Sequence, residues 1–207
     1  MWHILSFGGD RLKLKKAETK VFANLRWSAK NEKNVPAQSL PSAVSQLCPN
    51  CGLCCDSTLF ADVELRKGDD PQRLASFGLA LVQKTKTKLA FPQPCACFDG
   101  KLCGIYTDRP KRCRLFECGV LKRVGSGELT AGAALEKISR AKAMAEKVRQ
   151  LLRDSGQREE HLPLTQRYSA AMSAPVDFSE EGAAERRGEL MLAVSGLMQM
   201  LEAEFLR

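Results

Sequence analysis

Two hydrophobic patterns divide this chain of 207 residues. After Gly127 the hydrophobic positions recur every three or four residues, which is the spacing of an amphipathic helix. The first helical series is expected to end at Ser155 and Gly156. Its apolar face comprises Ala134, Leu135, Ile138, Ala141, Ala145, Val148 and Leu152. The second series predicts a long helix with a face of Ala184, Arg187, Leu190, Met191, Val194, Leu197, Met198, Leu201 and Phe205.

The second helix has Asp177 and Ser179 as candidate N-terminal caps. Pro163 and Pro175 indicate a connector between the two helices. Two amphipathic helices joined in this way predict an antiparallel helical hairpin over residues 128–207.

In the middle of the chain, hydrophobic and polar residues alternate over a shorter period. All nine cysteines lie there, between residues 48 and 118. Residues 60–65 predict a short strand, and KTKTKLAF (84–91) predicts a half-exposed strand. Between them, DDPQRLASFGLAL (69–81) predicts a short helix with Pro71 near its first turn. Residues 48–120 are therefore expected to form an irregular, cysteine-rich module.

Residues 1–47 combine basic side chains with the linker-like composition NVPAQSLPSAVSQ, which predicts a basic, partly disordered N-terminal arm. No apolar run approaches the roughly 20 residues of a membrane span. The apolar stretch near the N-terminus has only about six residues, too few for the core of a signal peptide. We therefore expect a cytoplasmic protein with no membrane contact.

The formal net charge of +8 is unevenly distributed. Residues 1–47 contain eight Lys/Arg and three acids, residues 48–118 contain eleven and eight, and residues 119–207 contain thirteen of each. Two sites of four thiolates each, filled by a total metal charge of +4, would lower the net charge from +8 to about +4. Because basic and aromatic residues do not interleave, nucleic-acid binding is disfavoured, and a protein partner stays open.

The cysteines begin with CPNCGLCC at residues 48–55. Its proline and glycine favour a loop over a helix, so that closely spaced thiolates can reach one ion. Cys54 and Cys55 are adjacent, and their side chains are expected to diverge. Cys55 would then serve a second metal, bridge two metals or remain a spare thiol. Eight of the nine cysteines could complete two four-thiolate sites, with Cys97 as the ninth.

Metal binding is favoured over a disulfide scaffold, because the count is odd and cytoplasmic thiols stay reduced. His3 and His161 lie in the arm and the connector, where we expect solvent exposure. A nearly all-sulfur site suits Zn(II), an Fe–S cluster or Cu(I). The first three spacings match a ferredoxin-type run, but Cys55 and Asp56 depart from it. Zinc and iron both stay open.

CPNCGLCC together with PCACFDGKLCGIYTDRPKRCRLFEC (94–118) resembles the YkgJ family of cysteine-cluster proteins, also described as the CxxCxxCC zinc- or iron-chelating domain. The resemblance covers about residues 48–118 and implies metal chelation, with no defined reaction. Phe98 replaces the family's usual leucine, and Cys97 is an additional thiol. The implied metal ligands are Cys48, Cys51, Cys54, Cys55, Cys95, Cys103, Cys113 and Cys118.

Arg109 and Arg114 are candidate groups behind the ligands, because nearby cations stabilise thiolates. With two histidines in the chain, no catalytic constellation is evident, although an oxidoreductase-type Fe–S role stays open. We expect a mainly α fold with irregular loops: a small metal-stabilised cysteine-rich module followed by the helical hairpin. Its function would be zinc or iron binding with a redox or metal-handling role. The alternative is a structural-zinc module that binds protein or nucleic acid.

Overall fold

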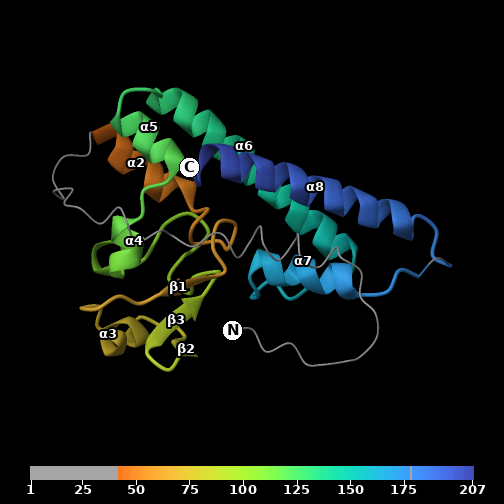
Figure 1. The fold of residues 1–207 in the computed structure, drawn as a ribbon, viewed down its shortest axis with the longest axis horizontal. Coiled ribbons are helices and arrows are strands. Elements are labelled where there is room, and N and C mark those ends of the chain that lie inside the picture. Colours follow the sequence, from red (N-terminus) through yellow and green to blue (C-terminus); the bar gives the residue numbers. More distant parts are fainter. Residues whose placement is uncertain (1–41, 178) are drawn as a thin grey trace. The chain divides into compact units, whose positions relative to one another are not determined.

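The computed structural model describes residues 42–177 and 179–207, all within one compact unit, Pro36–Arg207. About half of these residues are helical, so the prediction of a mainly α fold is confirmed, with a small sheet added (Figure 1). The expected N-terminal arm lies outside the described residues, except that helix α2 already begins at Ser42. The elements are α2 (Ser42–Cys51), β1 (Asp62–Glu64), α3 (Pro71–Ser76), β2 (Val82–Thr85), β3 (Lys88–Pro92), the 3-10 helix η2 (Tyr106–Asp108), α4 (Lys111–Leu115), α5 (Gly119–Gly125), α6 (Ala131–Asp154), α7 (Leu164–Ser173) and α8 (Ala183–Glu204).

Helices α6 and α8 pack against each other along much of their length. Lys137 pairs with Glu204 at 2.8 Å, and Lys147 pairs with Glu189 at 2.5 Å, so the two helices run in opposite directions. The predicted connector between them contains a third helix, α7, which contacts α6. This part of the chain therefore has three helices where the sequence predicted two.

The predicted apolar faces are correct at most positions and wrong at three, because Ala184 near the start of α8 is exposed, as are Leu135 and Met191. On α6 the buried positions include Ala134, Ile138, Ala141, Ala145, Val148 and Leu152, as predicted, together with Leu151. Leu135 is 46% exposed, and Met191 on α8 is 47% exposed, because each lies at the edge of its stripe. The predicted cap of α8 is also wrong: Gly182 is the N-cap, whereas Asp177 accepts hydrogen bonds from Ser179 in the turn before it.

The sheet is antiparallel, with strand order β1-β3-β2. The segment KTKTKLAF, predicted as one strand, turns at residues 86–87 and so contributes to both β2 and β3. Strand β1 lies within the predicted segment 60–65, and α3 begins at Pro71 as expected. The carboxylate of Asp70 caps α3 by accepting hydrogen bonds from the backbone N–H groups of Gln72 and Arg73.

Two hydrophobic cores stabilise these elements. The larger one, called the helical core below, contains 17 buried hydrophobic residues, mainly from α5, α6, α7 and α8. The smaller one, called the sheet core, contains four: Val63, Leu74, Leu79 and Phe91. A fully buried Leu or Phe contributes about 1.5–3 kcal/mol, so the apolar stabilisation of the helical core is several times larger.

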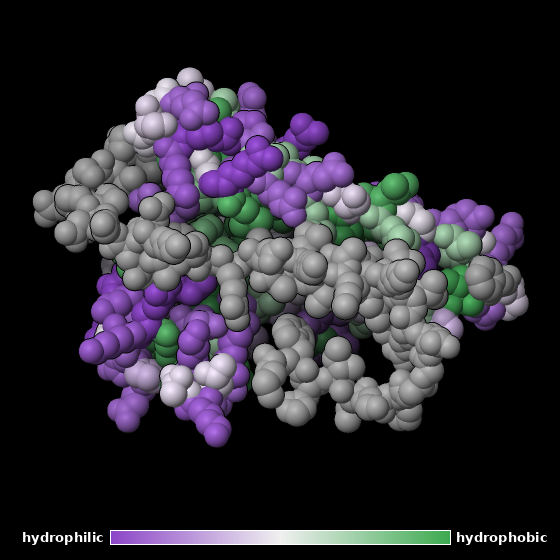
Figure 2. Space-filling model, in the orientation of Figure 1, coloured by the Kyte–Doolittle hydropathy of each residue, from purple (hydrophilic) through white to green (hydrophobic). Residues whose placement is uncertain are grey.

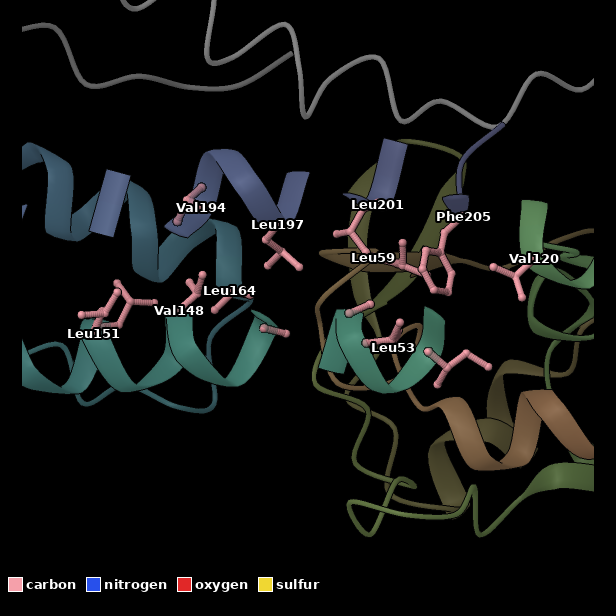
Figure 3. Packing of buried hydrophobic residues seen from close by; sticks show 14 of the residues in the cluster. Leu53, Leu59, Val120, Val148, Leu151, Leu164, Val194, Leu197, Leu201 and Phe205 are labelled. Carbon is pink, nitrogen blue, oxygen red and sulfur yellow. The ribbon is translucent and has the colours of Figure 1, made fainter. Parts of the chain in front are cut away.

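The helical core also includes residues from the first cysteine segment. Leu47, Leu53 and Leu59 are almost completely buried in it. Figure 3 shows Leu53 and Leu59 directed toward Phe205, just after α8, with Val120 of α5 beside them. The cysteine-rich segment therefore shares its core with the helices that follow it.

The surface differs between the two parts. On the face shown in Figure 2, hydrophilic residues gather around the sheet, whereas hydrophobic residues emerge along the long helices. Leu192 on α8 is 76% exposed. No helix within the described part of the chain is long and apolar enough to cross a bilayer.

Candidate metal centre

The first cysteine motif is half helix and half turn, so the prediction of a loop throughout is wrong for its first part. Cys48 and Cys51 both lie in the last turn of α2, three residues apart, and Pro49 lies between them. Gly52 has a φ of +76°, a left-handed conformation that ends the helix at low steric cost. The backbone N–H groups of Cys55 and Asp56 both donate to the carbonyl of Gly52, at 2.8 and 3.0 Å.

The second half of the cysteine set packs directly on this turn. A Cβ atom at Gly52 would lie 2.6 Å from Cζ of Phe98, so glycine leaves the space that the ring occupies. The backbone N–H of Cys95 donates to the carbonyl of Cys55 at 2.8 Å. These contacts join two segments that are separated by 39 residues in the sequence.

Local hydrogen bonds position the remaining cysteines. The N–H of Phe98 donates to the carbonyl of Cys95 at 3.0 Å, and Phe98 pairs with Cys103 in an isolated β-bridge. Cys113 lies on α4, whose first residue, Lys111, donates its backbone N–H to the carboxylate of Asp69 at 2.8 Å. Cys118 is the N-cap residue of α5.

All nine cysteines are free and partly buried. They divide according to the core that they contact: Cys51, Cys54 and Cys118 pack against the helical core, and Cys95, Cys97 and Cys113 pack against the sheet core. Below, the helix-side cysteines are Cys51, Cys54 and Cys118 together with Cys48, whose charge raises the pKa of all three. The sheet-side cysteines are Cys95 and Cys113 together with Cys55 and Cys103: Cys95 is the strongest thiol neighbour of Cys55, and the charge of Cys103 raises the pKa of the other three. Cys103 also raises the pKa of Cys48, so the two sets adjoin there.

The thiols are crowded enough to change one another's acidity. Burial raises the pKa of Cys51 and of Cys113 to about 12, and that of Cys95 to about 11. Burial also raises the pKa of Cys54 and Cys55 above the usual range. After burial, the largest further increase comes from Cys51 for Cys54 and from Cys95 for Cys55. The two adjacent thiols therefore have different nearest thiol neighbours.

Backbone N–H groups are directed at three of the sulfurs. Cys51 accepts a hydrogen bond from the N–H of Leu53, Cys95 accepts one from Cys97, and Cys118 accepts from Val120 and Leu121. Each of these bonds lowers the pKa of its thiol, because an N–H donor stabilises a thiolate. Donors of this kind are suited to sulfurs that become anionic.

Arg109 lies between the two sets of cysteines. Its Nε donates to the carbonyl of Tyr106 at 2.8 Å, and its guanidinium lies 3.5 Å from the centre of the Tyr106 ring. Held in this way, the guanidinium hydrogen-bonds Cys48, and its charge lowers the pKa of both Cys48 and Cys113 against the raising effect of burial. Arg114, the other predicted cation, is exposed on α4.

Cys97 differs from the other cysteines near the sheet. Its thiol donates to the carbonyl of Phe77 at 3.3 Å, in the loop after α3. It also lies beside Cys95, and burial raises its pKa. Its sulfur is therefore already engaged with a backbone oxygen.

Within residues 42–177 and 179–207, no three His, Cys, Asp or Glu side chains are gathered closely enough to hold a metal ion. The electrostatic influence of one thiol on another extends well beyond a zinc–sulfur bond of about 2.3 Å. The cysteines of each set therefore influence one another's pKa without being gathered at the distances of metal ligands.

Two supporting contacts were not evident from the sequence. Arg149 of α6 pairs with the carboxylate of Asp56 at 2.9 Å and donates to the hydroxyl of Thr58 at 2.9 Å, which fixes the turn after Cys55 to the helices. Gly119 donates its N–H to the carbonyl of Phe205 at 2.9 Å, and a Cβ there would lie 2.6 Å from the carbonyl oxygen of Glu204. Arg149 occupies an ordinary polar helix position, so no sequence signal marked it.

The fold and the clustered thiols define a cysteine-cluster protein. Residues 47–147 match the model of a family described as "CxxCxxCC: Putative zinc- or iron-chelating domain", so this part of the chain is similar to that family. The match covers all nine cysteines and extends into α6. No curated protein and no solved structure matches the chain.

Proposed function

We propose that this protein binds zinc or iron through cysteine thiolates, with Cys48, Cys51, Cys54, Cys55, Cys95, Cys103, Cys113 and Cys118 as the ligands. The observation that carries the proposal is the contact between the two cysteine segments, through Gly52 and Phe98 and through the Cys55–Cys95 backbone bond. Sulfur ligands suit zinc, Cu(I) and iron–sulfur clusters, and the family description favours zinc or iron.

The surroundings of the thiols support metal binding more than a reactive cysteine. A nucleophilic or redox-sensing thiol needs a lowered pKa, whereas burial raises the pKa of Cys51, Cys95 and Cys113. A metal ion can replace the protons of such thiols, because its positive charge compensates the thiolates that burial alone disfavours. Arg109 would offset part of the negative charge of the loaded thiolates, and Arg114 would add a weaker, exposed cation.

A bound metal would stabilise the part of the fold that has the smallest apolar core. The sheet core contains four buried hydrophobic residues, and Cys95, Cys97 and Cys113 pack at its edge. This supports a structural role for the metal, in which the cysteine-rich region serves as an interaction module. An iron–sulfur cluster would in addition allow electron transfer.

Elemental analysis of protein purified without oxygen tests the proposal. Stoichiometric zinc in a colourless sample supports chelation with a structural role. A brown sample that contains iron and sulfide and absorbs broadly in the visible range supports a cluster. Folded protein that contains no metal, and takes up neither zinc nor iron after reduction, would overturn the proposal.

A further inference from the structure

We infer that the chain holds two separate four-cysteine metal sites: one on the helical core formed by Cys48, Cys51, Cys54 and Cys118, and one on the sheet core formed by Cys55, Cys95, Cys103 and Cys113. This inference rests on the proposed function, because it assigns the thiols of that function to individual sites. It also makes Cys97 the ninth thiol, outside both sites.

The turn after α2 separates the adjacent Cys54 and Cys55. Cys54 packs against the helical core, together with its neighbour Leu53, which is completely buried there. Cys55 is instead joined to the second segment, since its carbonyl accepts the N–H of Cys95. Two successive residues are thus connected to different cores, and one ion cannot be chelated comfortably by both.

The helix-side cysteines come from two elements that touch. Cys48 and Cys51 lie on the last turn of α2, and α2 packs against α5, whose N-cap residue is Cys118. The start of α5 is fixed by the bond from Gly119 to the carbonyl of Phe205. In Figure 3, Val120 lies on the Phe205 side of this core. The two helices and the turn that carry this set therefore pack on the largest core of the protein.

The sheet-side cysteines are held by contacts of their own. Cys95 and Cys103 are connected through Phe98, which bonds to the first and bridges to the second. Cys113 is positioned by α4, which is anchored to Asp69 and packs near β1. None of these anchors involves α5, α6 or α8. Cys95, Cys103 and Cys113 are therefore held by anchors outside these helices, whereas Cys55 is held by the turn after α2, which Arg149 of α6 fixes through Asp56.

The two sets adjoin, and Arg109 lies where they meet. It hydrogen-bonds Cys48 of the first set and lies close enough to Cys113 of the second to lower that thiol's pKa. A divalent ion bound by four thiolates has a net charge of about −2, so two neighbouring sites repel each other. The fixed guanidinium between them reduces this repulsion.

The position of Cys97 explains why the ninth thiol is left over. The thiol of Cys97 already donates a hydrogen bond to the carbonyl of Phe77. Cys95, which packs against the sheet core beside it, is the proposed ligand there. The Cys97 backbone N–H donates to the sulfur of Cys95. Its thiol also contacts that of Cys95, so Cys97 supports this ligand through both its backbone and its side chain.

Native mass spectrometry of zinc-loaded, reduced protein tests the division. The wild type should hold two zinc ions per chain, and Cys54→Ser and Cys55→Ser should each hold one. Double variants then separate the sites. Cys54→Ser/Cys118→Ser, within one set, should keep one ion, whereas Cys54→Ser/Cys113→Ser, across the sets, should keep none. Circular dichroism should show helix in all four, because the helical core does not depend on zinc.

The results distinguish failure of the division from failure of the proposed function. No zinc in the wild type would overturn the proposed function and the division with it. One ion per chain, or a single multinuclear cluster lost as a whole in every variant, would overturn the division alone. So would a within-set double variant that loses both ions, or a cross-set double variant that keeps one.

Discussion

The helix side and the sheet side of this protein hold similar numbers of cysteines on very different foundations. The helical core buries 17 hydrophobic residues, including Leu53 and Leu59 from the cysteine-rich segment itself. The sheet core buries four hydrophobic residues, and three of the nine cysteines pack against it. Under the proposed function, we expect a bound metal to add little to the stability of the helix side and much to that of the sheet side.

The difference between the two cores predicts that the stability of only one part of the protein depends on a bound metal. Small cores below a threshold size need disulfides, metals or partners to fold. The sheet side meets that description, whereas the helix side is stabilised by α5, α6, α7 and α8. The predictions below test whether the two sides respond as differently as their cores suggest.

Metal removal should produce the largest effect, and it should be confined to the sheet side. An ion present at about 100 times its Kd stabilises the fold by about 2.7 kcal/mol. Hydrogen exchange in β1, β2 and β3 should therefore accelerate by about 100-fold or more after chelation. Amides of α6 and α8 should keep their protection and serve as the internal control. Equal loss of protection on both sides would contradict the comparison.

Gly52→Ala should be the most damaging single substitution at the junction between the sides. Its φ of +76° costs about 1–2 kcal/mol for a residue with a Cβ, and the Cβ would meet the ring of Phe98 at 2.6 Å. We expect a loss of about 2–4 kcal/mol in the free energy of unfolding, measured by urea denaturation.

Gly100→Ala is the matched control for Gly52→Ala. Gly100 has a φ of +93°, but no atom lies within 4 Å of the position of its Cβ. Its variant should lose only the backbone contribution of about 1–2 kcal/mol. Equal losses in the two variants would show that the contact between Gly52 and Phe98 does not join the two cysteine segments.

Glu204→Gln tests an electrostatic contact of the helix side. Glu204 pairs with Lys137 and Arg123, and these hydrogen bonds lower the pKa of its carboxyl. A lowered pKa contributes stability above the unfolded value of about 4.3, and this stability is lost as pH falls through the folded pKa. The variant should therefore be about 1 kcal/mol less stable at pH 7, with a difference that disappears under acid conditions.

Glu202→Gln provides the control for this experiment. Glu202 is exposed on the same helix, two residues away. Thermal unfolding at pH 7 should barely change in this variant. A Glu204→Gln difference that stays constant from pH 7 to below the folded pKa would mean that the carboxylate charge is not what stabilises the end of α8.

The sequence predicted the parts of this fold that depend on local patterns. Most of the buried stripe of α6 and the start of α3 at Pro71 follow from spacing and residue type alone. The turn at residues 86–87 was missed because lysine and threonine alternate on both sides of it, which resembles one strand. Helix α7 was missed because Pro163 and Pro175 suggested a connector, whereas they flank the helix.

The sequence predicted which residues form the candidate site, but it did not predict how they are arranged in space. The cysteines identify themselves by spacing, and the divergence expected for Cys54 and Cys55 agrees with their different neighbours. Which cysteine joins which core depends on contacts across tens of residues, such as the one between Gly52 and Phe98. Such contacts have no local signature, because they are fixed by packing of the whole fold.

Cys97→Ser should have the smallest effect on metal content and stability. It tests whether the sheet side uses four thiols or five. The thiol of Cys97 donates to the carbonyl of Phe77, and a serine hydroxyl can make a similar bond. We expect unchanged zinc content by elemental analysis and a change in unfolding free energy within about 0.5 kcal/mol.

Cys95→Ser is the matched variant, two residues away on the same turn, and it should lose one ion together with protection in the sheet. If Cys97→Ser loses an ion as well, the sheet side uses five thiols and not four. Its small core would then be stabilised by a larger centre than the helix side has. If only Cys95→Ser loses the ion, two cysteines packed against the same core differ because the sulfur of Cys97 is already engaged with a backbone carbonyl.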